Sequence, residues 1–335
     1  MNIAVDVFGG DNAPQAILDG CMLALEQNKD MHLILVGEAL VIEKYLSEHA
    51  HDANRIRIKH APEIITIHEQ PTVAIKHKKD SSLVQALMCV VEGDAGCMVS
   101  AGSTGAVLAG ATLLIRRLKG VKRPALAPIM PTRDGCILLV DCGANIDCKP
   151  QYLQQFAVMG SAYMQHVMGL KSPRIGLLNN GAEAEKGNEL TKATYGLMLQ
   201  TPVNFVGNCE GRDVLSGDFD VVVCDGFSGN IVLKNTEGVA ALLVDMLKDE
   251  LMRDKRSKIA AVLAKPAFRR FKSRMDYTEY GGAPLLGVNG GVIKAHGSSN
   301  AKAFAAALKQ ARAYVLGNVT EAIGEAIAAM EPVEE

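Results

Sequence analysis

Short apolar runs alternate with longer amphipathic stretches from the start of the chain. The pattern predicts strands over residues 2–8, 31–36 and 55–61, with helices over 14–27 and 39–49 between them. Strands that are joined through helices pair in parallel by right-handed crossovers. The first sixty residues therefore predict the edge of an open α/β sheet.

The same alternation continues along the rest of the chain and predicts one three-layer α/β/α domain over residues 1–335, built on a mostly parallel, doubly wound sheet. The expected strands and helices are as follows. Strands are expected over 95–100, 124–131, 136–141, 174–178, 203–206, 218–224 and 292–296, and helices over 81–92, 106–118, 150–167, 231–251, from 189 and from 301.

The stretch 95–119 is the one around which the chain is organised. A buried strand ends at Ser100, a turn of small residues follows, and a helix is expected from Ala106. A strand-to-helix turn presents unpaired backbone N–H groups beside the positive end of a helix dipole, which suits a phosphate. The phosphate would contact Ser103, Thr104 and Gly105. The alternative is an ordinary helix that Ser103 or Thr104 caps.

The uncharged run from Cys97 to Ile115 approaches the length of a membrane span. Glycines and hydroxyl side chains interrupt it, and two arginines end it. We therefore interpret it as strand, turn and helix.

Small or polar loops follow four predicted strands, at residues 9–14, 101–105, 141–149 and 225–230. In an open α/β sheet, ligands bind at the carboxyl ends of strands near a topological switch point. Together with the nearby segment 186–188, these loops predict a shared cleft that handles phosphate. His296 also ends a predicted strand, where a site residue or a structural histidine is equally expected.

Composition narrows the class of protein. The chain has 335 residues, of which 48% are hydrophobic and 4% aromatic, and a net charge of −2, so nothing indicates nucleic acid. The eight cysteines contain no Cys-x-x-Cys pair, which favours reduced, buried thiols over zinc. Because the chain enters a strand at once, we expect no signal peptide and a cytoplasmic protein.

Residues 249–276 depart from this pattern. They carry nine positive and four negative side chains, a net charge of +5, around an apolar centre that includes Val262, Leu263 and Phe268. The pattern predicts a projecting amphipathic hairpin of two helical arms joined near Pro266. Such a segment suits an anionic membrane surface or an acidic partner. Its apolar residues could instead pack on the body of the protein or on a second subunit.

The candidate chemistry consists of hydroxyls, amides, one lysine and one histidine. The sequence has no G-x-S-x-G, Walker or H-E-x-x-H motif. Asp141, Asp147 and Asp225 could bind a divalent metal, but each could equally brace a loop. A site rich in oxyanion donors suits a reaction in which phosphate itself is the nucleophile.

Several segments together resemble the bacterial phosphate acyltransferase family PlsX, in the family's order from residue 1 to about 315. They are IAVDVFGGDNAP (3–14), SAGSTGA (100–106), RPALA (123–127), GANIDCKP (143–150), KGNE (186–189), NCEGRD (208–213), DGFSGN (225–230) and IKAHGSSNA (293–301). The resemblance implies reversible transfer of a fatty acyl group from acyl carrier protein to inorganic phosphate, giving acyl phosphate for phospholipid synthesis. It also implies a homodimer and a fold like that of the isocitrate and isopropylmalate dehydrogenases and the phosphotransacetylases.

Within this resemblance, the expected roles follow residue by residue. Ser103, Thr104 and Gly105 would bind phosphate, Lys186 would balance its charge, Asn230 would donate to the oxyanion, and His296 would orient phosphate or protonate the departing thiolate. No metal or cofactor is expected. The expected partners are acyl carrier protein, an anionic membrane surface and, as a candidate, the membrane glycerol-3-phosphate acyltransferase PlsY. Further cleft candidates are Asp6, Asp11, Asn145, Asn188, Asp225 and Ser228.

Two other classes remain open at this stage. A metal-dependent dehydrogenase of related fold would need a nicotinamide site, which the degenerate Gly9-Gly10-Asp11 turn disfavours. A non-catalytic adaptor for membrane or carrier protein would need only the basic hairpin.

Overall fold

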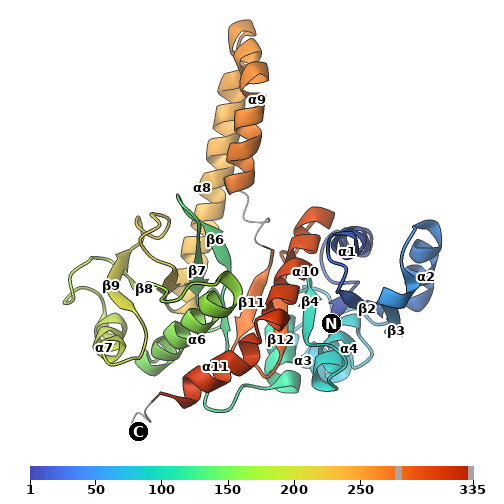
Figure 1. Cartoon of the computed structure of the whole chain (residues 1–335), viewed down its shortest axis with the longest axis horizontal. Helices are drawn as coiled ribbons and strands as arrows, with labels where there is room; N and C mark the ends of the chain where they lie inside the picture. The colour runs from blue at the N-terminus through green and yellow to red at the C-terminus, as the bar shows by residue number, and fades with distance from the viewer. Residues whose placement is uncertain (276–280, 331–335) are drawn as a thin grey trace.

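The computed structural model of the chain describes residues 1–275 and 281–330 and shows two β-sheets covered by helices (Figure 1). The predicted α/β class is confirmed, but the single expected sheet is divided into a seven-stranded and a five-stranded sheet. The elements before the junction of the sheets are β1 (Asn2–Asp6), α1 (Gln15–Gln27), β2 (His32–Gly37), α2 (Ala39–Glu48), η1 (Ala53–Arg55), β3 (Ile56–His60), α3 (Pro71–His77), α4 (Ser82–Val91), β4 (Cys97–Ser100), α5 (Thr104–Gly110), η2 (Ala111–Ile115) and β5 (Ala125–Leu126).

The chain then builds the five-stranded sheet and returns to the first one. These elements are β6 (Ile129–Pro131), β7 (Cys136–Val140), α6 (Pro150–Met168), β8 (Ile175–Asn179), α7 (Glu189–Met198), β9 (Phe205–Glu210), β10 (Val221–Val223), α8 (Gly226–Met252), α9 (Lys255–Met275), β11 (Ala283–Leu286), β12 (Gly291–Lys294), α10 (Ala301–Leu316) and α11 (Val319–Ala328).

The seven-stranded sheet has the order β3-β2-β1-β4-β12-β11-β5 and is parallel except for β11, which runs against both of its neighbours. Alternate residues of β1 face two different cores. Ile3 and Val5 pack with α1 and α10, whereas Ala4 packs with α4 and α5. Because successive side chains of a strand point to opposite faces, both faces of this sheet need a helical cover.

The five-stranded sheet has the order β6-β7-β10-β8-β9, with β6 antiparallel to β7 and the other pairs parallel. Leu138 and Val140 of β7 pack with α6, and Ile137 and Leu139 fill a smaller core on the other face. The carboxyl ends of β7, β10 and β8 therefore lie at one edge of this sheet.

The two sheets meet where the predicted strand 124–131 is interrupted. Pro128, which lacks a backbone N–H, lies between β5 and β6, and each of these short strands joins a different sheet. Backbone bonds from Leu139 N to the Pro128 carbonyl (3.0 Å) and from Cys142 N to the Leu126 carbonyl (2.8 Å) connect the β7 edge to this junction. The junction is the topological switch point of the fold.

The predicted helix 106–118 starts earlier and ends earlier than expected. It begins at Thr104, widens into a π-helical turn at Ala111–Ile115, and stops at Arg116, whose φ is +70°. An arginine in this left-handed region cannot continue a right-handed helix.

Helices α8 and α9 project from the junction as an antiparallel pair (Figure 1). The predicted turn near Pro266 is wrong, because the chain reverses at residues 253 and 254 and Pro266 lies inside α9. The projecting pair also includes α8 well before residue 249. Residue 276, the last of the expected hairpin, lies outside the described residues.

No helix within residues 1–275 and 281–330 combines the length and the low charge that a bilayer crossing requires.

Candidate active site

A cleft of about 220 Å³ lies at the junction of the two sheets. The carboxyl end of β12, the amino end of α5, the β5–β6 segment and the first turns of α8 all border it. Its side chains include three residues predicted from the sequence, Thr104, Asn230 and His296, and others that were not predicted, among them Lys234, Glu237 and Lys294.

Three buried polar residues end adjacent strands beneath this cleft. Asp6 of β1 and Lys294 of β12 flank Ser100 of β4 in register. The Ser100 hydroxyl donates to the Asp6 carboxylate at 2.6 Å and accepts from the Gly102 N–H at 3.0 Å. Asp6 therefore holds the turn that begins α5 through Ser100. Burial raises the pKa of Asp6 above its usual range.

Lys294 is 8% exposed and lines the cleft. Its ammonium donates to the carbonyls of Ala101, at 3.2 Å, and Ala295. Burial lowers the pKa of Lys294 to about 8, and the nearby carboxylates of Asp6 and Asp11 oppose that shift. The sequence did contain a signal for it, a lone lysine at the end of an apolar strand.

The turn after β4 caps a helix and also contributes one residue to the lining of the cleft. Ser103 is the N-cap of α5, because its hydroxyl accepts from the Ala106 N–H at 3.4 Å. A Cβ on Gly105 would lie 2.8 Å from the Pro71 side chain, so this glycine is required by packing against α3. Of the three predicted phosphate contacts, Thr104 is the one that lines the cleft.

The loop after β7 is a rigid wall of the site. Asp141 is fully buried and accepts four hydrogen bonds, from the N–H groups of Leu126, Ala144 and Asn145 and from the Asn145 amide, over 2.6–3.2 Å. The Asn145 amide also donates to the Pro124 carbonyl at 2.8 Å. Both side chains thus brace the loop. Burial raises the pKa of Asp141 to about 6, although these hydrogen bonds oppose the shift.

The position of Asn230 follows from how α8 begins. Asp225 caps this helix by accepting from the N–H and hydroxyl of Ser228, at 2.8 and 2.9 Å. The first turn packs tightly on the β7 loop, since a Cβ at Gly229 would lie 2.0 Å from the Asp141 carbonyl oxygen. This contact places the amide of Asn230 on the cleft wall beside Lys234.

His296 lies at the edge of the cleft. Its Nδ1 accepts from the Ser298 N–H at 3.3 Å and lies 2.8 Å from the Ser298 hydroxyl, so the proton of the neutral ring is on Nε2. Burial, followed by the positive charge of Lys234, lowers the pKa of His296 and favours that neutral form. Lys234 is paired with Glu237 at 2.7 Å.

The remaining predicted residues are not part of the cleft lining. Asn188 caps α7 by accepting from the Thr191 N–H at 2.9 Å. Lys186 lies in the loop after β8, where it packs near Gly181. The backbone N–H of Asp11 donates to the Gly297 carbonyl at 2.8 Å. Asp141 and Asp225 act as brace and cap, and residues 1–275 and 281–330 contain no cluster of three or more potential metal ligands.

Comparisons with known proteins find relatives that match nearly the whole chain. The family profile described as fatty acid synthesis protein matches residues 1–322. A phosphate acyltransferase of Clostridium botulinum is 52% identical over 93% of both chains, and one of Clostridium acetobutylicum is 51% identical over 93% of this chain and 94% of its own.

Two solved structures share the fold at low identity. A phosphotransacetylase from Streptococcus pyogenes aligns with a TM-score of 0.58 and 18% identity, covering 98% of this chain and 94% of that one. A branched-chain phosphotransacylase from Enterococcus faecalis aligns with a TM-score of 0.59 and 15% identity, covering 94% and 99%. The profile match and the identity to the clostridial proteins show that this chain belongs to the fatty acid synthesis protein family, which confirms the PlsX resemblance of its motifs.

Proposed function

We propose that this protein is an enzyme that transfers a fatty acyl group reversibly from acyl carrier protein to inorganic phosphate in the cytoplasm. The observation that carries the proposal is the junction cleft, which gathers Thr104, Asn230, Lys294 and His296 from three separate segments, the start of α5, the start of α8 and the end of β12. These are a hydroxyl, an amide, an ammonium and an imidazole, which can bind an oxyanion and stabilise another as it forms. The clostridial relatives named phosphate acyltransferase support the same reaction.

The reaction requires the protein to position two reactants. A phosphate oxygen attacks the thioester carbonyl carbon, and the carbonyl oxygen becomes an oxyanion to which the Asn230 amide donates. Once the bond to the phosphate oxygen has formed, the oxyanion collapses to a carbonyl, and the C–S bond breaks with its electron pair staying on sulfur. His296 would orient the bound phosphate or protonate that thiolate. Positioning and charge stabilisation then supply most of the rate.

We further propose that Lys294, in place of the predicted Lys186, balances the charge of the bound phosphate. Lys294 and Thr104 line the same cleft, whereas Lys186 lies on the loop after β8 outside that lining. A partly desolvated ammonium interacts more strongly with an anion than an exposed one does, because water screens it less.

The purified protein should convert an acyl carrier protein thioester and phosphate into acyl phosphate without added metal or nucleotide. The measurement is phosphate-dependent release of the carrier thiol, followed together with hydroxylamine trapping of acyl phosphate. Chelator should leave the rate unchanged. Thiol release that is independent of phosphate, or loss of turnover with chelator, would show that the assignment is wrong.

A homodimer would cover the exposed apolar stripe on α8. Val239, Leu242, Leu243 and Met246 recur at helical spacing and are 46–58% exposed. A contiguous apolar surface of this kind marks a protein interface. We propose that two copies pair along this stripe.

The outer part of α9 has a different surface. Ile259, Val262 and Leu263 share one face and are 64%, 71% and 78% exposed. The predicted docking residue Phe268 lies on nearly the opposite face and is half-buried. Exposed basic side chains flank the apolar face at Arg253, Lys255, Arg256 and Lys258. We propose that this face binds anionic membranes, where acyl phosphate would be passed to a membrane acyltransferase such as PlsY.

Replacing Ile259, Val262 and Leu263 together with Gln should release the protein from anionic liposomes while activity on soluble substrates persists. Burying each side chain contributes about 1.5–3 kcal/mol, and each basic residue adds about 1 kcal/mol near an anionic surface. Binding should also weaken with salt, because screening acts beyond about 10 Å at 0.1 M ionic strength. Co-sedimentation with liposomes measures both effects.

Two controls separate membrane docking from dimer formation. Leu40→Gln changes a leucine of α2 that is 75% exposed, and it should bind liposomes normally. Leu242→Glu with Met246→Glu should lower the mass seen by light scattering. If the α9 variant loses the dimer and keeps liposome binding, α9 is a subunit interface and the docking proposal fails.

A further inference from the structure

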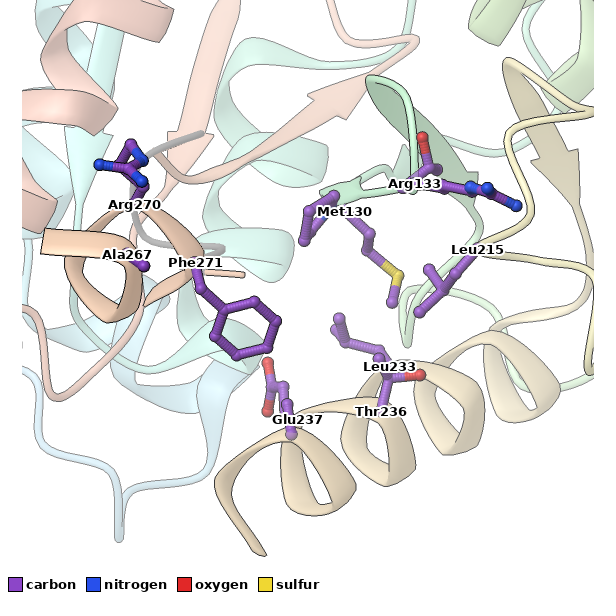
Figure 2. Close-up of a pocket in the computed structure, with 12 residues that line it drawn as sticks. Met130, Arg133, Leu215, Leu233, Thr236, Glu237, Ala267, Arg270 and Phe271 are labelled. Carbon is purple, nitrogen blue, oxygen red and sulfur yellow. The ribbon is translucent and has the colours of Figure 1, made fainter. Parts of the chain in front are cut away.

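A second cavity, of about 630 Å³, opens beside the cleft and is lined mainly by apolar side chains. Its walls come from β6, from the inner face of α8, from α9 and from Leu215. Figure 2 shows Met130, Leu215, Leu233 and Phe271 directed toward one another across it, whereas the guanidinium groups of Arg133 and Arg270 point away. The volume is in the range of small-molecule sites.

The cavity and the cleft share a boundary. Leu233 and Glu237 line both of them. On α8 they follow Asn230 by three and seven residues. Leu233, Glu237 and Ala240 continue along one face of the helix at spacings of four and three residues. From Asn230 to Ala240 the helix advances about 15 Å. A molecule whose reacting end is beside Asn230 can therefore extend along α8 into the apolar space.

The charged side chains at the boundary between the cleft and the cavity pair with each other. The Glu237 carboxylate accepts from the Lys234 ammonium at 2.7 Å, which places an ion pair where the polar cleft gives way to the cavity. Beyond it, Met130 is 2% exposed and Ala240 and Ala267 add small apolar walls. Such a lining favours an uncharged hydrocarbon over a polar headgroup or a peptide.

We infer that this cavity holds the hydrocarbon chain of the acyl donor, with the thioester carbonyl at Asn230 and the chain running between α8 and α9. The inference rests on the proposed acyl transfer and adds the site that recognises the chain. It also makes α9 a wall of the substrate site, so that the length of chain accommodated depends on the side chains that α8 and α9 place there.

Filling the cavity should change the chain-length preference. Ala267→Phe on α9 and, separately, Ala240→Phe on α8 should lower kcat/KM for a palmitoyl donor by about fourfold for each methylene that is displaced. The value for a butyryl donor should stay unchanged, because a short chain does not reach these positions. Both donors are presented on acyl carrier protein, and circular dichroism confirms that each variant is folded.

The matched control is Ala260→Phe, which lies about two turns earlier on the same face of α9, is exposed, and is outside the cavity lining. It should keep the original preference. Equal losses for palmitoyl and butyryl donors in both cavity variants, or no loss for either, would overturn the inference. If the unaltered protein forms no acyl phosphate from either donor, the proposed function itself is wrong. That outcome differs from one in which the protein is active but the cavity variants do not change its chain-length preference.

A partner subunit seated in the cavity is the competing occupant. In that case, Ala267→Phe and Ala240→Phe would lower the mass measured by light scattering and would leave the chain-length preference unchanged. That combination also overturns the inference.

Discussion

Asn230→Ala should lower kcat by about a hundred- to a thousandfold while the protein stays folded, because it removes one preorganised donor to the oxyanion. The amide is held on the cleft wall by the tight contact between the first turn of α8 and the β7 loop. This donor acts mainly in the transition state, so the KM for phosphate should change little. Steady-state kinetics with both substrates varied measures the two parameters.

The matched control is Asn235→Ala. Asn235 is exposed on the same helix and lies outside the cleft lining, so its kinetics should equal those of the unaltered protein. A kcat within a factor of about two of the original for Asn230→Ala would mean that the oxyanion forms elsewhere, because a lost donor costs far more.

Lys294→Met should raise the KM for phosphate by about ten- to a hundredfold, the value of a hydrogen bond to a charged group. Methionine keeps the apolar stem of the side chain and removes the ammonium. Lys186→Ala should have a much smaller effect, because Lys186 lies outside the cleft lining. If Lys186→Ala raises the KM for phosphate more than Lys294→Met does, Lys186 balances the phosphate charge, as the sequence predicted.

The pH dependence tests the same lysine independently. Burial lowers the pKa of Lys294 to about 8, so its ammonium is present below that pH and is lost above it. The KM for phosphate should therefore rise as pH increases through about 8, whereas Lys294→Met should show no such rise. Thermal melts across the same pH range check that the effect is on binding and not on folding.

Local patterns determined most of the secondary structure and the location of the candidate site. The alternation in residues 2–8 predicted the first strand, and the polar segments after β4, β7 and β10 predicted where a ligand could bind. These inferences hold because side-chain periodicity and loop composition are properties of consecutive residues. The motif series identified the family for a related reason, since its matches extend over nearly the whole chain.

Only the tertiary structure decided how those segments meet. The interruption at Pro128 divides the strands into two sheets and creates the junction cleft, which no local pattern shows. Lys294 ends an apolar strand, and its role depends on Asp6 and Ser100, which lie nearly two hundred residues or more away along the chain. The turn of the hairpin was misplaced because Pro266 suggested a helix end, although α9 continues through it.

The functions of the polar loop residues were also decided in three dimensions. Asp141, Asn145 and Asn188 are polar loop residues that could have bound a ligand. In the structure, Asp141 and Asn188 accept from backbone N–H groups of their own loop or helix, and the Asn145 amide donates to the Pro124 carbonyl. The cavity between α8 and α9 depends on an antiparallel pairing that brings Ala240 near Ala267. A sequence specifies such contacts only through the packing of the whole chain, because the free energy of burial depends on all the neighbours of a side chain and not on its position in the sequence.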